Sequence, residues 1–461
     1  MIGRALAQDV LDAALSRGGH FADLFLEDRL TRTLLLRSGK LENANAGRSH
    51  GAGVRVFAGG QYYYVYTNDT SRDGLMTCAL RAAAAVQEGI AHTPAQPLVR
   101  SIQPNAHPVR LLPGDIPGER VAAKLREAAQ AAQAHSPEIS QVTVRYTDWD
   151  QQMTVANSLG LLTDDRRVYS RIMCGAVASA GGENQTGSAN PGARVGFELF
   201  DALVDPKELG EFAARQAVTM LHAPACPAGV MPVVIDNGFG GVIFHEACGH
   251  SLEAISISRG MSEFCGKLGQ QVASPRVSAY DDGTLPNEWG SLNIDDEGTP
   301  TTNLALIEHG VLKNYMVDRF YGERMGMPST GSCRRQSYAY APCPRMRNTY
   351  IAAGEDDEAE MIATMGDGLY AKAMGGGSVN PATGEFNFAV DEGYLVKDGR
   401  IAHPVRGASL IGRGSEVLTR IDRVGRDMRM SQGMCGASSG SIPTNVGQPM
   451  IRVSSMTVGG K

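Results

Sequence analysis

His245, Glu246 and His250 are the residues of this chain whose types and spacing point most clearly to chemistry. They lie in the segment GVIFHEACGHSLEAIS, where the two histidines are five positions apart and a glutamate directly follows the first. Neutral imidazoles are common ligands of Zn²⁺, and a carboxylate beside a metal can take a proton from water. The segment therefore predicts a metal site in which Glu246 is the general base.

The spacing of the two histidines, HExxxH, requires a distorted helix. In a regular α-helix, side chains four positions apart differ in direction by about 40°, whereas those five apart differ by about 140°. Two imidazoles five positions apart converge only if the helix is widened by one residue, as in a π-bulge. Gly249, directly before the second histidine, lowers the cost of this distortion. The alternative is a pair of ordinary helix histidines.

A catalytic zinc generally has three protein ligands, so a third ligand is needed beyond the two histidines. Cys435 lies in the glycine-flanked segment MCGASSGSIP, where a thiolate can be held exposed, and cysteine is a strong zinc ligand. Spacing alone leaves the other cysteines and many carboxylates as rivals. Cys248, inside the motif, is one of them, and we expect it to be a structural thiol.

The elements that must position these residues divide the chain into two halves. The N-terminal half, residues 1–222, is expected to be an α/β domain with mixed sheets and packing helices, divided into subdomains at about 1–100 and 118–222. The proline-rich segment 222–232 is the predicted boundary. The C-terminal half, residues 231–461, is expected to be a mainly β domain that carries the distorted metal-binding helix. The fold class is therefore α+β.

Local patterns predict the elements of the N-terminal half. Alternating apolar and polar residues indicate strands, and apolar residues at helical spacing indicate helices. We expect an N-terminal helix, strands at 21–36, 54–66, 142–156 and 166–178, helices at 72–85, 118–135 and 207–222, and loops at 93–117 and 181–196.

Composition and charge exclude several classes of protein. The formal net charge of the 461 residues is -6, and basic residues form no stripe that could neutralise a run of phosphates, so direct nucleic-acid binding is not expected. No stretch approaches the roughly 20 apolar residues that span a bilayer, and the N-terminus is not typical of a signal peptide. The eight cysteines form no close pair. These features predict a cytoplasmic protein without a membrane segment.

Several C-terminal segments resemble the TldD and PmbA family, on its TldD side. They are VIFHEACGHSLEA, GTLPNEWGSLNIDDEGTPTTNLALIEHGVLKNYMVDR, STGSCRRQSYAYAPCPRMRNT, GEFNFAVDEGYLVKDG and GMCGASSGSIPTNVGQPMIRVSSMTVGG. The resemblance implies a zinc metallopeptidase in which His245, His250 and Cys435 bind the metal and Glu246 is the base. It also implies a homodimer, or a heterodimer with a PmbA-like subunit, that encloses a chamber.

The resemblance further implies that the substrates are unfolded peptides, bound as an added strand at a sheet edge. They include the leader peptides of ribosomal natural products and small unfolded proteins. Two alternatives remain at this point: a non-catalytic binding protein with a purely structural metal, and a regulatory subunit of another enzyme such as DNA gyrase. Oxyanion-stabilising donors are expected from a segment rich in tyrosine and arginine, with the candidates Tyr338, Tyr340, Arg334 and Arg345.

Overall fold

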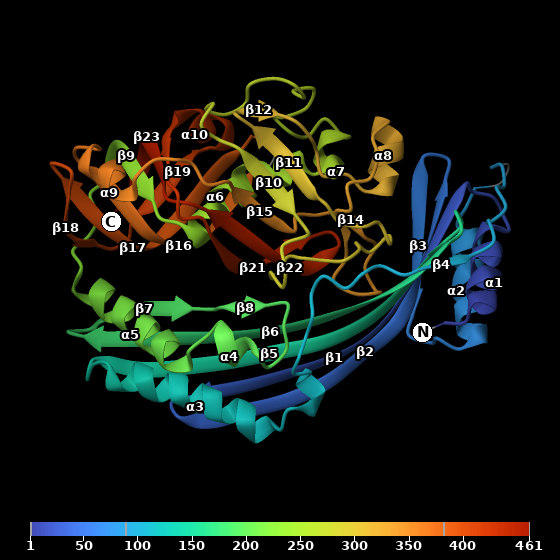
Figure 1. The fold of residues 1–461 in the computed structure, drawn as a ribbon, viewed down its shortest axis with the longest axis horizontal. Coiled ribbons are helices and arrows are strands. Elements are labelled where there is room, and N and C mark those ends of the chain that lie inside the picture. The colour runs from blue at the N-terminus through green and yellow to red at the C-terminus, as the bar shows by residue number, and fades with distance from the viewer. Residues whose placement is uncertain (1, 88–89, 381–382, 461) are drawn as a thin grey trace.

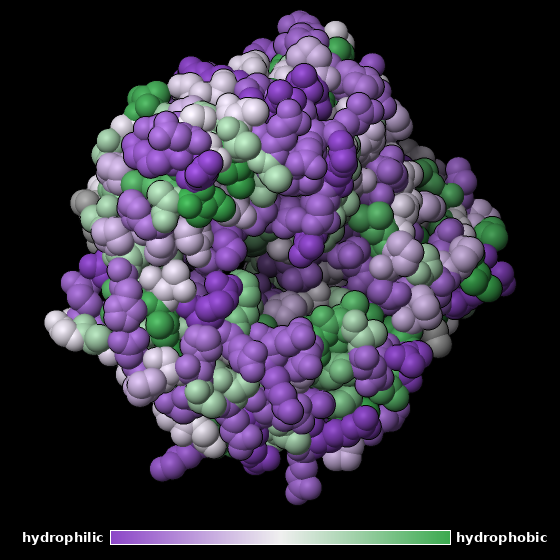
Figure 2. Space-filling model, turned by 60° about the vertical axis from the view of Figure 1, so that its left-hand side comes forward, coloured by the Kyte–Doolittle hydropathy of each residue, from purple (hydrophilic) through white to green (hydrophobic). Residues whose placement is uncertain are grey.

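The computed structural model describes residues 2–87, 90–380 and 383–460 and has an α+β fold. A large N-terminal sheet covered by helices lies beneath a C-terminal part that is built on two further sheets (Figure 1). One face of the molecule is hollowed near its centre, with mostly hydrophilic residues above the hollow and a group of hydrophobic residues below it (Figure 2).

The N-terminal sheet has eight strands, in the order β3-β2-β1-β5-β6-β4, with β7 and β8 also pairing with β6. All of its pairs are antiparallel except that of β4 with β6. Its longest strands curve beneath the C-terminal part, as twisted sheets do (Figure 1). The strands are β1 (Phe21–Arg37), β2 (Lys40–Ala58), β3 (Gln61–Thr67), β4 (Val99–Ser101), β5 (Ile139–Asn157), β6 (Leu161–Ala180), β7 (Glu183–Ala189) and β8 (Gly192–Ala193).

Two groups of helices cover this sheet, and each has its own hydrophobic core. The first helix buries the apolar residues of one face, at the spacing i, i+3, i+4 and i+7. The last begins with a proline, and the Asp205 side chain caps it by accepting a hydrogen bond from the Lys207 N–H. The helices are α1 (Arg4–Leu15), α2 (Arg72–Ala84), the 3₁₀ turn η1 (Pro113–Asp115), α3 (Gly118–Ala134), α4 (Leu199–Ala202) and α5 (Pro206–His222).

The C-terminal part contains a six-stranded sheet in the order β12-β11-β10-β15-β22-β21 and a seven-stranded sheet in the order β16-β9-β23-β19-β17-β18, with β20 on β23. A two-stranded pair, β13-β14, stands apart from both. The strands are β9 (Gly229–Ile235), β10 (Ala279–Asp282), β11 (Asn303–Glu308), β12 (Val311–Leu312), β13 (Cys333–Arg334), β14 (Cys343–Pro344), β15 (Asn348–Ile351), β16 (Gly368–Asn380), β17 (Glu385–Lys397), β18 (Arg400–Val405), β19 (Ser409–Arg413), β20 (Ile421–Val424), β21 (Arg429–Ala437), β22 (Gly440–Gln448) and β23 (Ile451–Gly459).

The helical segment with the HExxxH motif lies in the largest hydrophobic core of the molecule, which also contains Cys435. Ile243, Phe244, Ala247 and Leu252 anchor it there. Its pieces are η2 (Gly238–Gly241), α6 (Val242–Phe244), η3 (His245–Gly249), η4 (His250–Leu252) and α7 (Ala254–Ile257). The remaining helices are α8 (Arg319–Met325), α9 (Glu358–Ala363) and α10 (Gly414–Arg420).

Three of the expected elements differ from the structure. The range 54–66 is not one strand, because the positive-φ glycines Gly59 and Gly60 turn the chain between β2 and β3. The range 181–196 is not a loop, because it contains β7 and β8, and the range 93–117 contains the short strand β4. In the described part of the chain, no helix is long and apolar enough to cross a membrane.

Candidate metal centre

The helix is widened where the motif requires it. Residues His245–Gly249 form a π-turn between α6 and the 3₁₀ turn η4. A π-turn contains an extra residue, so side chains five positions apart come to the same side. The rings of His245 and His250 accordingly lie 5.2 Å apart between their centroids. The distortion that was predicted from the spacing is therefore present in the structure.

Gly249 permits this geometry for a reason that the sequence did not show. A Cβ atom at this position would lie 2.2 Å from the Sδ atom of Met346, which is fully buried. Any larger residue would have to displace either Met346 or the π-turn. The glycine is therefore required by close packing as well as by backbone freedom.

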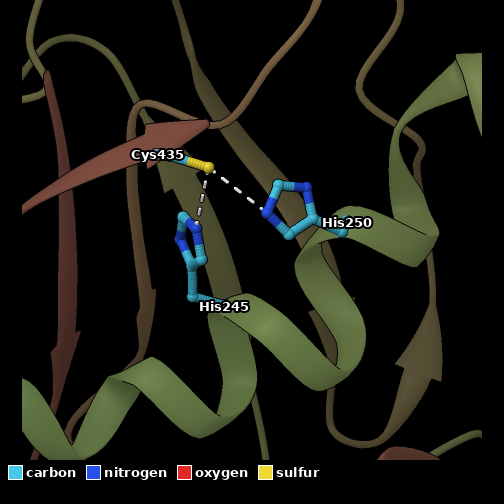
Figure 3. A group of neighbouring side chains, drawn as sticks. All are labelled: His245, His250 and Cys435. Atoms are coloured by element: carbon cyan, nitrogen blue, oxygen red, sulfur yellow. Dashed lines mark hydrogen bonds between the residues drawn. The ribbon is translucent and has the colours of Figure 1, made fainter. Parts of the chain in front are cut away.

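Cys435 approaches the two histidines from β21 (Figure 3). Its Sγ atom lies 3.3 Å from Nε2 of His245 and 3.2 Å from Nε2 of His250. In a tetrahedral zinc site, bond lengths of about 2.3 Å to sulfur and 2.0 to 2.1 Å to nitrogen would separate these atoms by about 3.5 Å. The three donors are thus already grouped as a metal would need them, and their chemistry suits zinc.

The three groups are also electrostatically matched to a cation. Burial alone would raise the pKa of the Cys435 thiol, but His245 and His250 outweigh burial, and the pKa lies well below its usual value. Burial would likewise lower the pKa of His250, but Glu253 and Cys435 raise it well above the ordinary range. The thiolate is therefore the favoured form of Cys435, and it is the form that binds metals.

Glu246 lies beside this group and reaches solvent. Its Oε2 atom is 3.7 Å from Nε2 of His250, and its side chain is 30% exposed, whereas that of His250 is 14% exposed. A carboxylate in this position can contact both solvent and a group held at the three donors. The structure therefore brings together all four residues singled out from the sequence: His245, Glu246, His250 and Cys435.

Two further residues support the candidate ligands, and the sequence does not single them out for this role. The Oε2 atom of Glu253 lies 3.3 Å from Nδ1 of His250, so the ring directs Nε2 toward Cys435. Arg345 donates a hydrogen bond from Nη2 to the Cys435 carbonyl at 2.5 Å, and its Nε lies 3.9 Å from Oε1 of Glu253. Glu253 follows His250 by three positions, a spacing that could have marked it as a partner of that ring.

The other candidates lie away from the three ligands. Cys248 is fully buried in the core, and burial raises the pKa of its thiol well above the usual value. Tyr338 packs against Tyr66 and Gly51 of the N-terminal sheet. Tyr340 closes a turn by donating its N–H to the Ser337 carbonyl. Arg334 is buried and donates to the Met346 carbonyl, so of the four proposed oxyanion donors only Arg345 contacts a ligand residue.

A second group of possible metal ligands consists of Glu297, Asp318 and Cys333, all buried. Arg55 of β2 already supplies a cation there, because its Nη2 atom bonds to Asp23 and lies 2.5 Å from Oε1 of Glu297. This group joins the N-terminal sheet to the C-terminal part through a buried ion pair. We therefore interpret it as structural.

Comparison with known proteins places the chain in a family. The models of the PmbA/TldA metallopeptidase domains match along its length: domain 1 at residues 22–86, the central domain at 111–221 and the C-terminal domain at 228–460. A metalloprotease TldD homolog of Haemophilus influenzae is 34% identical, covering 98% of this chain and 95% of that protein. The chain thus belongs to the PmbA/TldD family of metallopeptidases, as the resemblance predicted.

Other similar proteins share either the metalloprotease name or the fold. A metalloprotease of Methanothermobacter thermautotrophicus is 33% identical over 95% of both chains. A zinc metalloprotease TldD homolog of Saccharolobus solfataricus is 30% identical over 57% of this chain and 58% of that protein. A proposed modulator of a DNA gyrase from Thermotoga maritima MSB8 shares the fold, with a TM-score of 0.81 at 22% identity over 99% of this chain and 100% of that one. TldE from Thermococcus kodakarensis gives a TM-score of 0.77 at 15% identity over 98% of this chain and 99% of that one.

Proposed function

We propose that this chain is a zinc-dependent peptidase that hydrolyses peptide bonds in unfolded or extended peptides. One observation carries the proposal: two imidazoles and a thiol converge within 4.8 Å of one another beside the partly exposed carboxylate of Glu246. The name of the Saccharolobus solfataricus relative supports zinc as the metal. Its substrates would include small unfolded proteins and the leader peptides of ribosomal natural products.

Each residue has a distinct part in the proposed mechanism. His245, His250 and Cys435 would hold the zinc, which polarises water and the substrate carbonyl when it is bound. Glu246 takes a proton from the attacking water and delivers it to the leaving amine. Glu253 keeps Nε2 of His250 directed at the metal position.

The position of β21 supports an extended peptide as the substrate. β21 carries Cys435 and is the last strand in the order of its sheet, with β22 on one side. Successive residues of a strand present their backbone groups to alternate sides, so part of β21 is available to pair with a further strand. A peptide added there would lie along the strand that supplies the thiolate ligand, and main-chain pairing would tolerate many sequences.

We further propose that the active form is a homodimer or a heterodimer with a PmbA-like subunit, in the cytoplasm. The TldE of Thermococcus kodakarensis, which shares this fold, is the kind of chain that could serve as the second subunit. A non-catalytic protein with a structural metal would need a fourth protein ligand to close the site. The group of possible ligands around Cys435 in the described residues has three members, and this favours catalysis.

The test combines metal content per chain with cleavage of casein or an unstructured peptide. It compares wild type, Glu246→Gln, Cys435→Ala and the control Cys265→Ala, whose cysteine lies outside the ligand group. We expect one zinc per chain in wild type and in Glu246→Gln, with cleavage lost in the latter, and loss of zinc in Cys435→Ala. Cleavage by Glu246→Gln at the wild-type rate would refute the mechanism. A zinc-loaded wild type that cleaves only after addition of a PmbA-like chain would identify the heterodimer as the active form.

A further inference from the structure

A cavity of about 320 Å³ lies between the N-terminal sheet and the β21-β22 hairpin, next to the strand that carries Cys435. Its hairpin wall includes Met434, which directly precedes the ligand Cys435, and Ile442, which pairs with Cys435 across the hairpin. Its other wall includes Trp149 and Tyr169, whose rings stack 4.8 Å apart. We call it the arginine cavity.

The charge of the arginine cavity is one-sided. Four arginines line it, and no aspartate or glutamate is among the described residues that line it; the arginines are Arg29, Arg167, Arg334 and Arg335. Arg167 is neutralised by Asp296 at 2.7 Å. Arg29 lies farther from a carboxylate, with Nε 3.7 Å from Oε1 of Glu27, and its Nη1 donates a hydrogen bond to the Gln336 carbonyl at 3.2 Å.

The two adjacent arginines of the cavity lack ion pairs within the described structure. Arg334 is 3% exposed, and its guanidinium donates one hydrogen bond, to the Met346 carbonyl. Arg335 is 4% exposed, and its guanidinium donates to the Tyr64 hydroxyl and to the Asp296 carbonyl. Burial lowers the pKa of Arg334 to about 10. Arg334 is thus a buried cation without a carboxylate partner, so an anion that entered the cavity beside it would be favoured.

We propose that the arginine cavity binds a carboxylate of the peptide substrate, next to the bond that is cleaved. This inference rests on the proposed peptidase function. Guanidinium groups bind carboxylates through charge-assisted hydrogen bonds, and the aromatic and aliphatic walls suit the carbon atoms of a peptide better than a bare inorganic anion. A peptide along β21 would pass Met434 and Cys435 in succession, so one residue could reach the cavity while its neighbour reaches the metal.

The carboxylate has two possible sources, an acidic side chain or the C-terminus of the peptide. The probes are fluorescein-labelled glycine–serine peptides in four forms, with a central glutamate or glutamine and with a free or amidated C-terminus. Binding is measured by anisotropy to zinc-loaded Glu246→Gln protein, which is chosen because it should not cleave them. We expect removal of the relevant carboxylate to weaken binding about tenfold or more. If binding weakens when glutamate is replaced by glutamine, the carboxylate is that of the side chain. If binding weakens when the C-terminus is amidated, the carboxylate is that of the C-terminus.

Protein variants in the same Glu246→Gln background locate the effect. In Arg334→Met, the difference in affinity between charged and neutral peptides should shrink, while zinc content stays unchanged. Arg29→Met, at a half-buried position, should also reduce the difference in affinity between charged and neutral peptides. It replaces Arg334→Met in the test if that variant does not fold. The control is Arg126→Met, at an exposed position on α3, and it should bind charged and neutral peptides with the same difference in affinity as the unmodified background.

Two results would overturn the inference. One is equal binding of charged and neutral peptides to the Glu246→Gln protein, and the other is a charge preference that stays undiminished in both arginine variants. Either would leave the proposed peptidase function intact, because that function is read from zinc content and cleavage. If none of the four peptides binds, both the proposed carboxylate site in the cavity and the proposed extended-peptide substrate are refuted.

Discussion

The Oε2 atom of Glu253 lies 3.3 Å from Nδ1 of His250, and this contact orients a ring whose other nitrogen faces the Cys435 thiolate. The Glu253 side chain is buried, and its Oε1 atom faces Arg345 at 3.9 Å. Glu253 and Arg345 therefore connect two of the proposed ligands that are 185 residues apart in sequence, His250 through its ring and Cys435 through its carbonyl. The ligand positions are set by this connection as well as by the π-turn.

Replacement of Glu253 by glutamine should weaken zinc binding. Glutamine can keep a contact with Nδ1 of His250 but loses the negative charge that favours the metal-binding orientation, and such partners typically contribute about 10- to 100-fold in metal affinity. Zinc affinity is measured by competition with a chromophoric chelator. Glu416→Gln, on the exposed side of α10, is the control and should bind zinc like wild type. Equal affinities for the two variants would show that Glu253 does not position the ligand.

Replacement of Gly249 by alanine should damage the metal centre through packing. The new Cβ would lie 2.2 Å from Sδ of Met346, so either the methionine or the π-turn must move. Overpacking of a core typically costs about 1 to 3 kcal/mol, and movement of the π-turn would also displace the backbone directly before His250. Denaturant unfolding and zinc content give the two measurements.

The matched control for that substitution is Gly118→Ala at the start of α3, where a Cβ would meet no atom within 4 Å. Its unfolding free energy should stay at or slightly above the wild-type value, because alanine favours a helix more than glycine does. An unchanged zinc content and stability in Gly249→Ala would contradict the packing argument.

Sequence reasoning could predict the π-turn and the candidate site because the HExxxH pattern is local. HExxxH lies within six residues, and the direction of side chains along a helix was enough to predict the π-turn. Cys435 was one of several candidates by spacing, and the resemblance to a family selected it. The structure adds the contact that spacing cannot give, a thiol 3.2 Å from His250.

The segments whose structure differs from the sequence prediction depend on contacts between distant parts of the chain. Residues 181–196 are rich in glycine, serine and asparagine, which favours a loop, yet β7 and β8 form there because β6 offers them a paired edge. The alternating pattern places Gly59 and Gly60 within one strand, whereas in the structure these two glycines, with positive φ, form the turn between β2 and β3. The role of Arg345 could not be found locally, because its partners are Glu253 and the Cys435 carbonyl.

Removal of the Arg55 guanidinium should destabilise the contact between the N-terminal sheet and the C-terminal part. In Arg55→Met, Asp23 and Glu297 would remain buried without their cation, a loss that typically costs about 3 to 5 kcal/mol. Arg48→Met, on the same strand, breaks only an exposed ion pair with Asp28 and should cost at most about 1 kcal/mol. The free energy of unfolding in urea, measured for both variants and wild type, distinguishes these two losses. Losses of equal size would show that the buried pair is not the stronger contact.

Stability should fall in mild acid through His107, which is buried where the chain contacts Asn287. Burial, with a smaller effect of Arg194, lowers the pKa of His107 from 6.5 to about 4 in the folded protein. The unfolded chain therefore binds a proton more readily than the folded one in this range. The stabilising contribution is complete above pH 6.5 and is lost as the pH falls toward 4.

As the pH falls, His107 should lower the free energy of unfolding by up to about 1.4 kcal/mol for each pH unit. Asparagine at this position can still accept the Asn287 N–H but does not titrate, so His107→Asn should show a shallower decline of unfolding free energy between pH 6.5 and 4. The exposed His135, replaced in the same way, is the control and should leave the wild-type slope unchanged. If His107→Asn and wild type decline in parallel, the acid sensitivity of the fold originates in other groups.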